Sequence, residues 1–213
     1  MLIQSRLLNF IHVPKAAGSS IEKLLKTHTL DEAADERFRE GFASFAKGHG
    51  ISFPNHASAQ LRVEFLGMET YRRYFSFAFV RNPFDLVVSL YEYTHQRERA
   101  LFEKNGWELR THQKNILENS FEDWVLNFST GNSQSSYILS ESGSILVDFI
   151  GRTESLDSDI MKLYRLFGVE NPESMPRSNA TRRDDYQSYY SDATKAVIAE
   201  RYVDDLRLFG YEY

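Results

Sequence analysis

Two short apolar runs in this sequence each lead directly into the start of a helix. Leu7–Val13 reads LLNFIHV and runs into the small residues of PKAAGSS, after which Ile21–Lys26 has apolar residues on one helical face. Tyr74–Val80 reads YFSFAFV and ends at Arg-Asn-Pro, where Pro83 suits the first position of a helix that reaches about Arg99. Buried strands that alternate with helices are typical of a parallel sheet covered by helices.

The rest of the chain extends this alternation. Ile145–Ile150 (ILVDFI) reads as a third strand. Three further helices are expected at Phe121–Phe128, Leu156–Phe167 and Ser191–Phe209, the last ending at Gly210. Residues 29–60 are polar and interrupted by glycine and proline, so we expect loops and short elements there. The sequence therefore predicts a three-layer α/β fold with a mainly parallel central sheet flanked by helices, in a single domain over residues 1–213.

Charge and composition exclude some classes of function. The formal net charge of −5 argues against a nucleic-acid-binding protein, which would show a basic domain, so any bound anion must be held by a local site. The sequence has 0 cysteines, which excludes disulfides, a thiolate nucleophile and a zinc–thiolate site and favours a reducing, cytoplasmic location. The N-terminal apolar stretch is too short for a signal peptide, and we expect no transmembrane segment.

The loop PKAAGSS has the composition of an anion-binding helix start. The first amides of a helix have no intrahelical partner, and small residues let an anion approach the backbone. Ala17, Gly18, Ser19 and Ser20 would form this cradle, and Lys15 would add a positive charge. An ATP-binding Walker loop requires its lysine after the second glycine, so that assignment fails here. An ordinary strand-to-helix turn is the alternative.

A second segment, FAFVRNPFDLVVS, has similar properties. Arg81 follows the end of a predicted strand, and Ser89 lies two turns into the next helix. Arginine suits bidentate contact with a phosphate, and a serine hydroxyl can donate as well. Ligands of open α/β sheets bind outside the carboxyl ends of the strands, so both loops are expected to face one crevice. Two anion sites imply a ligand with two anionic ends, such as a nucleotide with a 3′-phosphate and a 5′-phosphosulfate.

These segments resemble a known family. FIHVPKAAGSSIE is similar to the 5′-phosphosulfate loop of the sulfotransferase superfamily, and FAFVRNPFDLVVSLYEY resembles its 3′-phosphate motif. IGRTESL and the C-terminal region from SNATRRDD onward are similar to the carbohydrate-type (family 2) branch, whereas Glu98–Gln134 shows little resemblance. The resemblance implies a P-loop-like fold and transfer of a sulfuryl group from 3′-phosphoadenosine 5′-phosphosulfate (PAPS) to an acceptor hydroxyl. The product nucleotide would be 3′-phosphoadenosine 5′-phosphate (PAP), the acceptor a carbohydrate or glycan, and no metal would be needed.

The same resemblance implies roles for individual residues. Lys15 would contact the sulfuryl-bearing 5′ end, and Arg81 and Ser89 would hold the 3′-phosphate. A further set of polar residues lies in a basic loop that covers the nucleotide in the family: Arg177, Ser178 and Arg182. A solvated basic loop is the alternative for that segment.

Transfer to an alcohol also requires a base near the attacking hydroxyl, and histidine is the side chain most suited to that role at neutral pH. His49 in KGHG is our candidate, because the flanking glycines leave room for an acceptor and the segment resembles the Gly-His stretch of uronyl 2-O-sulfotransferases. A histidine that decorates a turn is the alternative. His12 is expected to serve packing or loop support. The reserve bases are His95, Glu64 and Glu69.

Two other classes of function remain open. A nucleotide kinase would need a magnesium-binding carboxylate after a strand, and Asp148 and Glu154 are the candidates. A non-catalytic module that keeps the nucleotide site is the other alternative.

Overall fold

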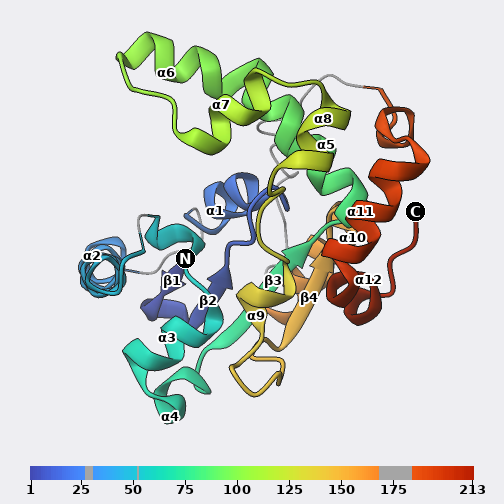
Figure 1. The fold of residues 1–213 in the computed structure, drawn as a ribbon. Helices are drawn as coiled ribbons and strands as arrows, with labels where there is room; N and C mark the ends of the chain where they lie inside the picture. The colour runs from blue at the N-terminus through green and yellow to red at the C-terminus, as the bar shows by residue number, and fades with distance from the viewer. Residues whose placement is uncertain (27–30, 52, 168–183) are drawn as a thin grey trace. The chain divides into compact units, whose positions relative to one another are not determined.

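The computed structural model describes residues 1–26, 31–51, 53–167 and 184–213. Figure 1 draws these residues as a ribbon, and they form two compact units. The first comprises the described residues within 1–80 and 134–179, and the second those within 81–133 and 180–213. The chain leaves the first unit between Val80 and Arg81.

A four-stranded sheet lies at the centre of the first unit, in the order β1-β2-β3-β4. Its strands are β1 (Leu2–Ile3), β2 (Leu8–Ile11), β3 (Phe75–Val80) and β4 (Phe149–Arg152). β1 pairs antiparallel with β2, whereas the β2–β3 and β3–β4 pairs are parallel. The predicted α/β class with a mainly parallel sheet is therefore confirmed.

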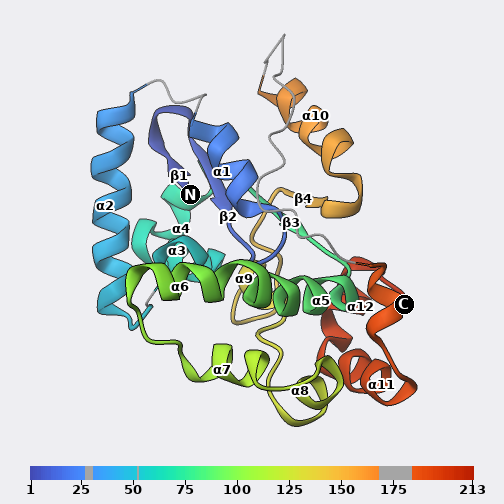
Figure 2. The same ribbon diagram turned by 90° about the horizontal axis from the view of Figure 1, so that it is seen from above.

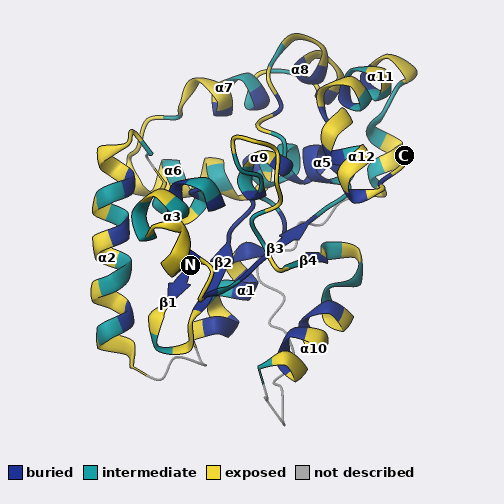
Figure 3. Ribbon diagram, turned by 90° about the horizontal axis from the view of Figure 1, so that it is seen from below, coloured by how far each residue is buried: buried dark blue, intermediate teal, exposed yellow. Residues whose placement is uncertain are grey.

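Helices flank this sheet. In the first unit they are α1 (Gly18–Lys26), α2 (Glu32–Gly48), α3 (Ala59–Leu66), α4 (Met68–Tyr71), α9 (Ser135–Ile138) and α10 (Leu156–Leu166). Figure 2 shows α2 beside the short strand β1 and α10 beside β4, and both helices contact those strands. Figure 3 shows β2 and β3 as buried, whereas α2 carries a continuous exposed side.

Alternation along the strands gives the sheet one apolar and one partly polar face. Leu8 and Phe77 face α1 and α10, with which they line a common apolar pocket. On the other face, Asn9 Nδ2 donates to Ser76 Oγ at 2.9 Å. Arg62 of α3, which is 1% exposed, donates from Nη1 to Asn9 Oδ1 at 2.6 Å. Helices therefore cover both faces of the central strands.

Two predictions for the first unit were wrong in detail. Residues 29–60 contain the 17-residue helix α2, whose N-cap Asp31 accepts a hydrogen bond from the amide of Ala34. The third strand lies at Phe149–Arg152 instead of Ile145–Ile150, because Asp148 accepts from the Ser76 amide and Ile145 forms only an isolated bridge. The first four residues of the predicted strand therefore precede β4, and only Phe149 and Ile150 belong to it.

The second unit is helical. Its helices are α5 (Pro83–Tyr93), α6 (Arg99–Asn105), α7 (Thr111–Leu117), α8 (Phe121–Asn127), α11 (Asp192–Arg201) and α12 (Val203–Phe209). Helices α5, α7, α8 and α11 enclose a core of aromatic and aliphatic side chains around Trp124, which is 1% exposed. The predicted helix Ser191–Phe209 is interrupted at Tyr202, whose hydroxyl donates to the Thr130 carbonyl, and it ends as expected at Gly210, with φ of 62°.

No helix within the described ranges combines the length and apolar character that a bilayer crossing requires.

Candidate functional site

The loop between β2 and α1 has an unusual backbone. Lys15 and Ala17 both adopt positive φ angles, of 65° and 60°, although neither is glycine. Such left-handed conformations cost free energy in residues with a Cβ atom and are concentrated at functional sites. The amides of Ser20 and Ile21 both donate to the Ala17 carbonyl, at 3.0 and 3.2 Å, so the turn passes directly into the helix.

This loop has the properties of an anion site. Gly18 and Ser19 precede the first intrahelical hydrogen bonds of α1, as at any helix start, and such amides bind anions well. Gly18 and Ser20 are buried, Ser19 is exposed, and Lys15 is half-buried. The helix dipole and the Lys15 ammonium both favour a negative charge here. The loop can therefore hold a phosphate-like group.

His12, at the base of this loop, is buried, as expected for a packing or supporting residue, and is 7% exposed. Its Nδ1 lies 3.1 Å from Glu22 Oε1 of α1. Burial alone would raise the pKa of the Glu22 carboxyl, but the hydrogen bond from His12 and nearby positive charge outweigh it, so the pKa is lowered. Glu22 is therefore a carboxylate that accepts the His12 proton.

His56 contacts His12 as well and so belongs with His12 and Glu22. The sequence had not indicated His56 as a site residue. Its Nδ1 donates to the His12 carbonyl at 3.1 Å, and the two rings are 4.4 Å apart. Burial, reinforced by the charge of His12, lowers the pKa of His56, so the ring is neutral near pH 7. With the proton on Nδ1, the Nε2 atom has a lone pair and can accept a proton. No local sequence signal marks His56, since its partner lies 44 positions away.

His49, the sequence candidate for the base, lies at the C-terminal end of α2 and is exposed. Its Nδ1 donates to the Phe45 carbonyl at 2.9 Å, and the two rings are 4.1 Å apart. These contacts are local to the helix end. A catalytic role for His49 stays a prediction.

The reserve bases lie elsewhere. Glu64 and Glu69 are exposed on α3 and α4. His95 belongs to the second unit, where its Nε2 bonds to the Ile116 carbonyl at 3.2 Å and its ring packs against Tyr91.

In the second unit, the segment Arg81-Asn82-Pro83 leads into α5. Asn82 is the N-cap and accepts from the Phe84 amide, and Pro83 follows at the first helical position. Arg81 Nε donates to Asp85 Oδ2 at 2.6 Å, which fixes the Nε edge of a guanidinium that is 19% exposed. Ser89 is 6% exposed on the same helix. Contact of Arg81 and Ser89 with a 3′-phosphate stays a prediction.

The remaining candidates divide into two groups. Arg177, Ser178 and Arg182 lie outside the described residues. Of the two carboxylates considered for magnesium, Asp148 accepts from the Ser76 amide at the start of β3, and Glu154 is exposed. Across the described ranges, no group of three or more histidine and acidic side chains is arranged to hold a metal ion.

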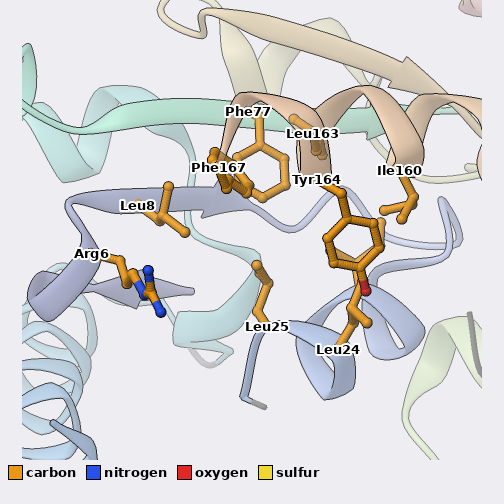
Figure 4. Close-up of a pocket in the computed structure, with 10 residues that line it drawn as sticks. Arg6, Leu8, Leu24, Leu25, Phe77, Ile160, Leu163, Tyr164 and Phe167 are labelled. Atoms are coloured by element: carbon orange, nitrogen blue, oxygen red, sulfur yellow. The ribbon is translucent and has the colours of Figure 1, made fainter. Parts of the chain in front are cut away.

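A pocket between α1, α10 and the sheet differs in character from the Lys15 loop (Figure 4). Apart from Arg6, its lining is aliphatic and aromatic: Leu8, Ile21, Leu24, Leu25, Phe77, Ile160, Leu163, Tyr164 and Phe167. This lining offers little to hold the phosphates of a nucleotide. The Lys15 loop is the better candidate for an anion.

Comparison with known proteins gives the family of this chain. The chain matches the sulfotransferase family over residues 4–212 and therefore belongs to that family. The match includes both the Lys15 loop and the Arg81 segment, and family membership supports sulfuryl transfer as the activity. No curated protein and no solved structure matches the chain.

Proposed function

We propose that this chain transfers a sulfuryl group from PAPS to a hydroxyl of a carbohydrate acceptor. The observation that carries the proposal is the β2–α1 loop of this sulfotransferase-family chain, where the left-handed residues Lys15 and Ala17 lead into the first turn of α1. PAPS and PAP carry the phosphate groups that this family recognises, and the carbohydrate acceptor follows from the sequence resemblance.

The reaction is an in-line displacement at sulfur. The acceptor oxygen forms a bond to sulfur while the bond from sulfur to the 5′-phosphate oxygen breaks, and PAP leaves. Negative charge grows on the leaving phosphate, so we propose that Lys15 and the amides of Gly18 and Ser19 stabilise it. The acceptor proton passes to a base as the new bond forms.

Arg81 and Ser89 are proposed to bind the 3′-phosphate. β2 and β3 are parallel, so their carboxyl ends lie at the same edge of the sheet, where ligands of α/β sheets bind. Arg81 directly follows the end of β3 in the chain. The basic residues Arg177 and Arg182, with Ser178, are proposed to cover the nucleotide on the sequence resemblance alone.

Two histidines are candidates for the base. His49 is proposed from the sequence. His56 is the second candidate, because its Nδ1–H bond to the His12 carbonyl leaves Nε2 as an acceptor and its lowered pKa keeps it neutral.

Three broader proposals accompany this function. The family match over residues 4–212 supports one sulfotransferase domain built from both units. The parallel strands followed by an anion loop support a three-layer P-loop-like fold. The sequence, with 0 cysteines, supports a cytoplasmic location.

A transfer assay tests the proposed function. The protein is mixed with PAPS that carries a labelled sulfuryl group and a pool of glycans, with a chelator present. We expect labelled glycan and stoichiometric PAP, because a sulfuryl group carries less charge than a phosphoryl group and needs no metal. Phosphate transfer from ATP that depends on magnesium, without sulfuryl transfer, would instead establish the kinase alternative.

A further inference from the structure

A pair of side chains joins the two ends of the Lys15 loop. His12 directly follows β2, and Glu22 lies in the second turn of α1. Their Nδ1 and Oε1 atoms are 3.1 Å apart, and the side chains are 8% and 22% exposed. Because a carboxylate only accepts hydrogen bonds, Nδ1 of His12 donates. The contact spans the loop from the strand end to the helix.

The other side of the His12 ring lies against the first residue of α1. A Cβ atom placed on Gly18 would lie 1.9 Å from His12 Nε2, far inside any permitted contact. Gly18 is therefore required here by the imidazole. Phe10, with its ring 5.7 Å away, and His56, at 4.4 Å, pack on the same imidazole. The ring is thus held by neighbours from the strand, the helix and the His56 turn.

The chain between these two contacts is strained. Lys15 and Ala17 each adopt a left-handed conformation, which costs free energy in a residue with a Cβ atom and persists only where the surrounding structure imposes it. His12 and Glu22 are well placed to impose it, since they fix both ends of the loop.

We propose that His12 and Glu22 are positioning residues that clamp the Lys15 loop in its left-handed conformation before the donor binds. The inference rests on the proposed function for the role of Lys15. A loop that is already in place pays no reorganisation cost as charge develops on the leaving group, so the clamp acts on turnover. Neither side chain needs to touch the substrate for this effect.

Substitution at position 22 tests the clamp with two readouts. We expect Glu22→Ala to lower kcat at saturating PAPS about tenfold or more and to speed hydrogen exchange of the amides of residues 16–21 in the ligand-free protein. Glu22→Gln keeps an oxygen acceptor and should restore part of both. Lys23→Ala, at the exposed neighbouring position of α1, is the matched control and should change neither.

A compensation experiment tests the contact with Gly18. Gly18→Ala should displace the His12 ring and raise loop exchange as strongly as Glu22→Ala does. In a His12→Ala background the same change should add little exchange, because the ring that the methyl group meets is gone. Additive effects of the two substitutions on exchange would overturn the proposed contact.

The outcomes separate the clamp from the proposed function. Unchanged loop exchange in Glu22→Ala overturns the clamp, whether or not turnover falls. Faster exchange with normal kcat overturns its role in positioning Lys15. If the parent protein transfers no sulfuryl group, the proposed function fails, and the exchange measurements still decide whether the clamp exists.

Discussion

Lys15 and Ala17, in the loop between β2 and α1, adopt left-handed backbone conformations that are strained in residues with a Cβ atom. A lysine at φ of 65° loses conformational stability, and such a conformation persists only where the surrounding structure imposes it. Loops of this kind trade folding free energy for preorganisation. The free energy that strain costs at one residue can be measured by substituting that residue.

Strain at Ala17 predicts an unusual response to glycine. Ala17→Gly should leave the free energy of unfolding unchanged or raise it by up to about 1 kcal/mol, because relief of the left-handed strain exceeds the entropy that glycine adds to the unfolded chain. Ala43→Gly, within helix α2, is the control and should lower it by about 1 kcal/mol. Chemical denaturation measures both. A loss at position 17 as large as at position 43 would show that the loop is not strained.

Substitutions of Lys15 and Arg81 are predicted to impair different steps, turnover for Lys15 and nucleotide binding for Arg81. Lys15→Ala should lower turnover more than nucleotide affinity, because charge develops on the leaving phosphate in the transition state. Arg81→Ala should mainly weaken binding, because the 3′-phosphate does not react. Steady-state kinetics with PAPS and calorimetry with PAP separate the two effects. Near-normal turnover of Lys15→Ala would remove it from catalysis.

The two candidate bases can be separated by kinetics. Replacing the true base by alanine should lower the transfer rate about 10²- to 10⁴-fold and leave PAP binding intact. A base must be deprotonated, so the rate rises with pH through its pKa. Since burial lowers the pKa of His56, that ascending limb should lie below about 6.5, the ordinary histidine value, and vanish in His56→Ala. A full limb in His56→Ala and its loss in His49→Ala would assign the base to His49.

At the scale of elements, the sequence predicted those strands and helices that have a clear local pattern of apolar and helix-starting residues. β2, β3 and α5 could be predicted because apolar runs ended at sharp helix starts. Helix α2 was missed because its apolar residues are spaced among many charges, and its stability depends on packing of Phe42 and its neighbours against α3 and β1. The His12–Glu22–His56 group could not be predicted, because no local sequence pattern indicates that segments far apart in the chain are in contact.

The polar face of the central strands carries a testable energetic asymmetry. Asn9→Leu should lower the free energy of unfolding by roughly 1–3 kcal/mol, because the buried Arg62 guanidinium loses its acceptor. Arg62→Met should cost less, since it removes a desolvated cation whose burial lowers its pKa to about 10. Urea denaturation midpoints measure both. A larger loss for Arg62→Met would show that the guanidinium contributes net stability.

At the scale of the whole molecule, the two proposed phosphate-binding segments belong to different compact units. Lys15 lies in the first unit and Arg81 opens the second. The match to the sulfotransferase family spans both units. We propose that one ligand with phosphates at both ends is recognised by both segments, and that neither segment suffices alone.

Binding of PAP compared with adenosine 5′-monophosphate tests this claim most directly. Thermal and chemical denaturation of the full chain are followed with each nucleotide, and with ATP plus magnesium. PAP at about 100 times its Kd should raise the free energy of unfolding by roughly 2.7 kcal/mol, and the monophosphate at the same concentration should add far less. Equal stabilisation by the monophosphate, or stabilisation by ATP plus magnesium alone, would contradict a dedicated site for the 3′-phosphate.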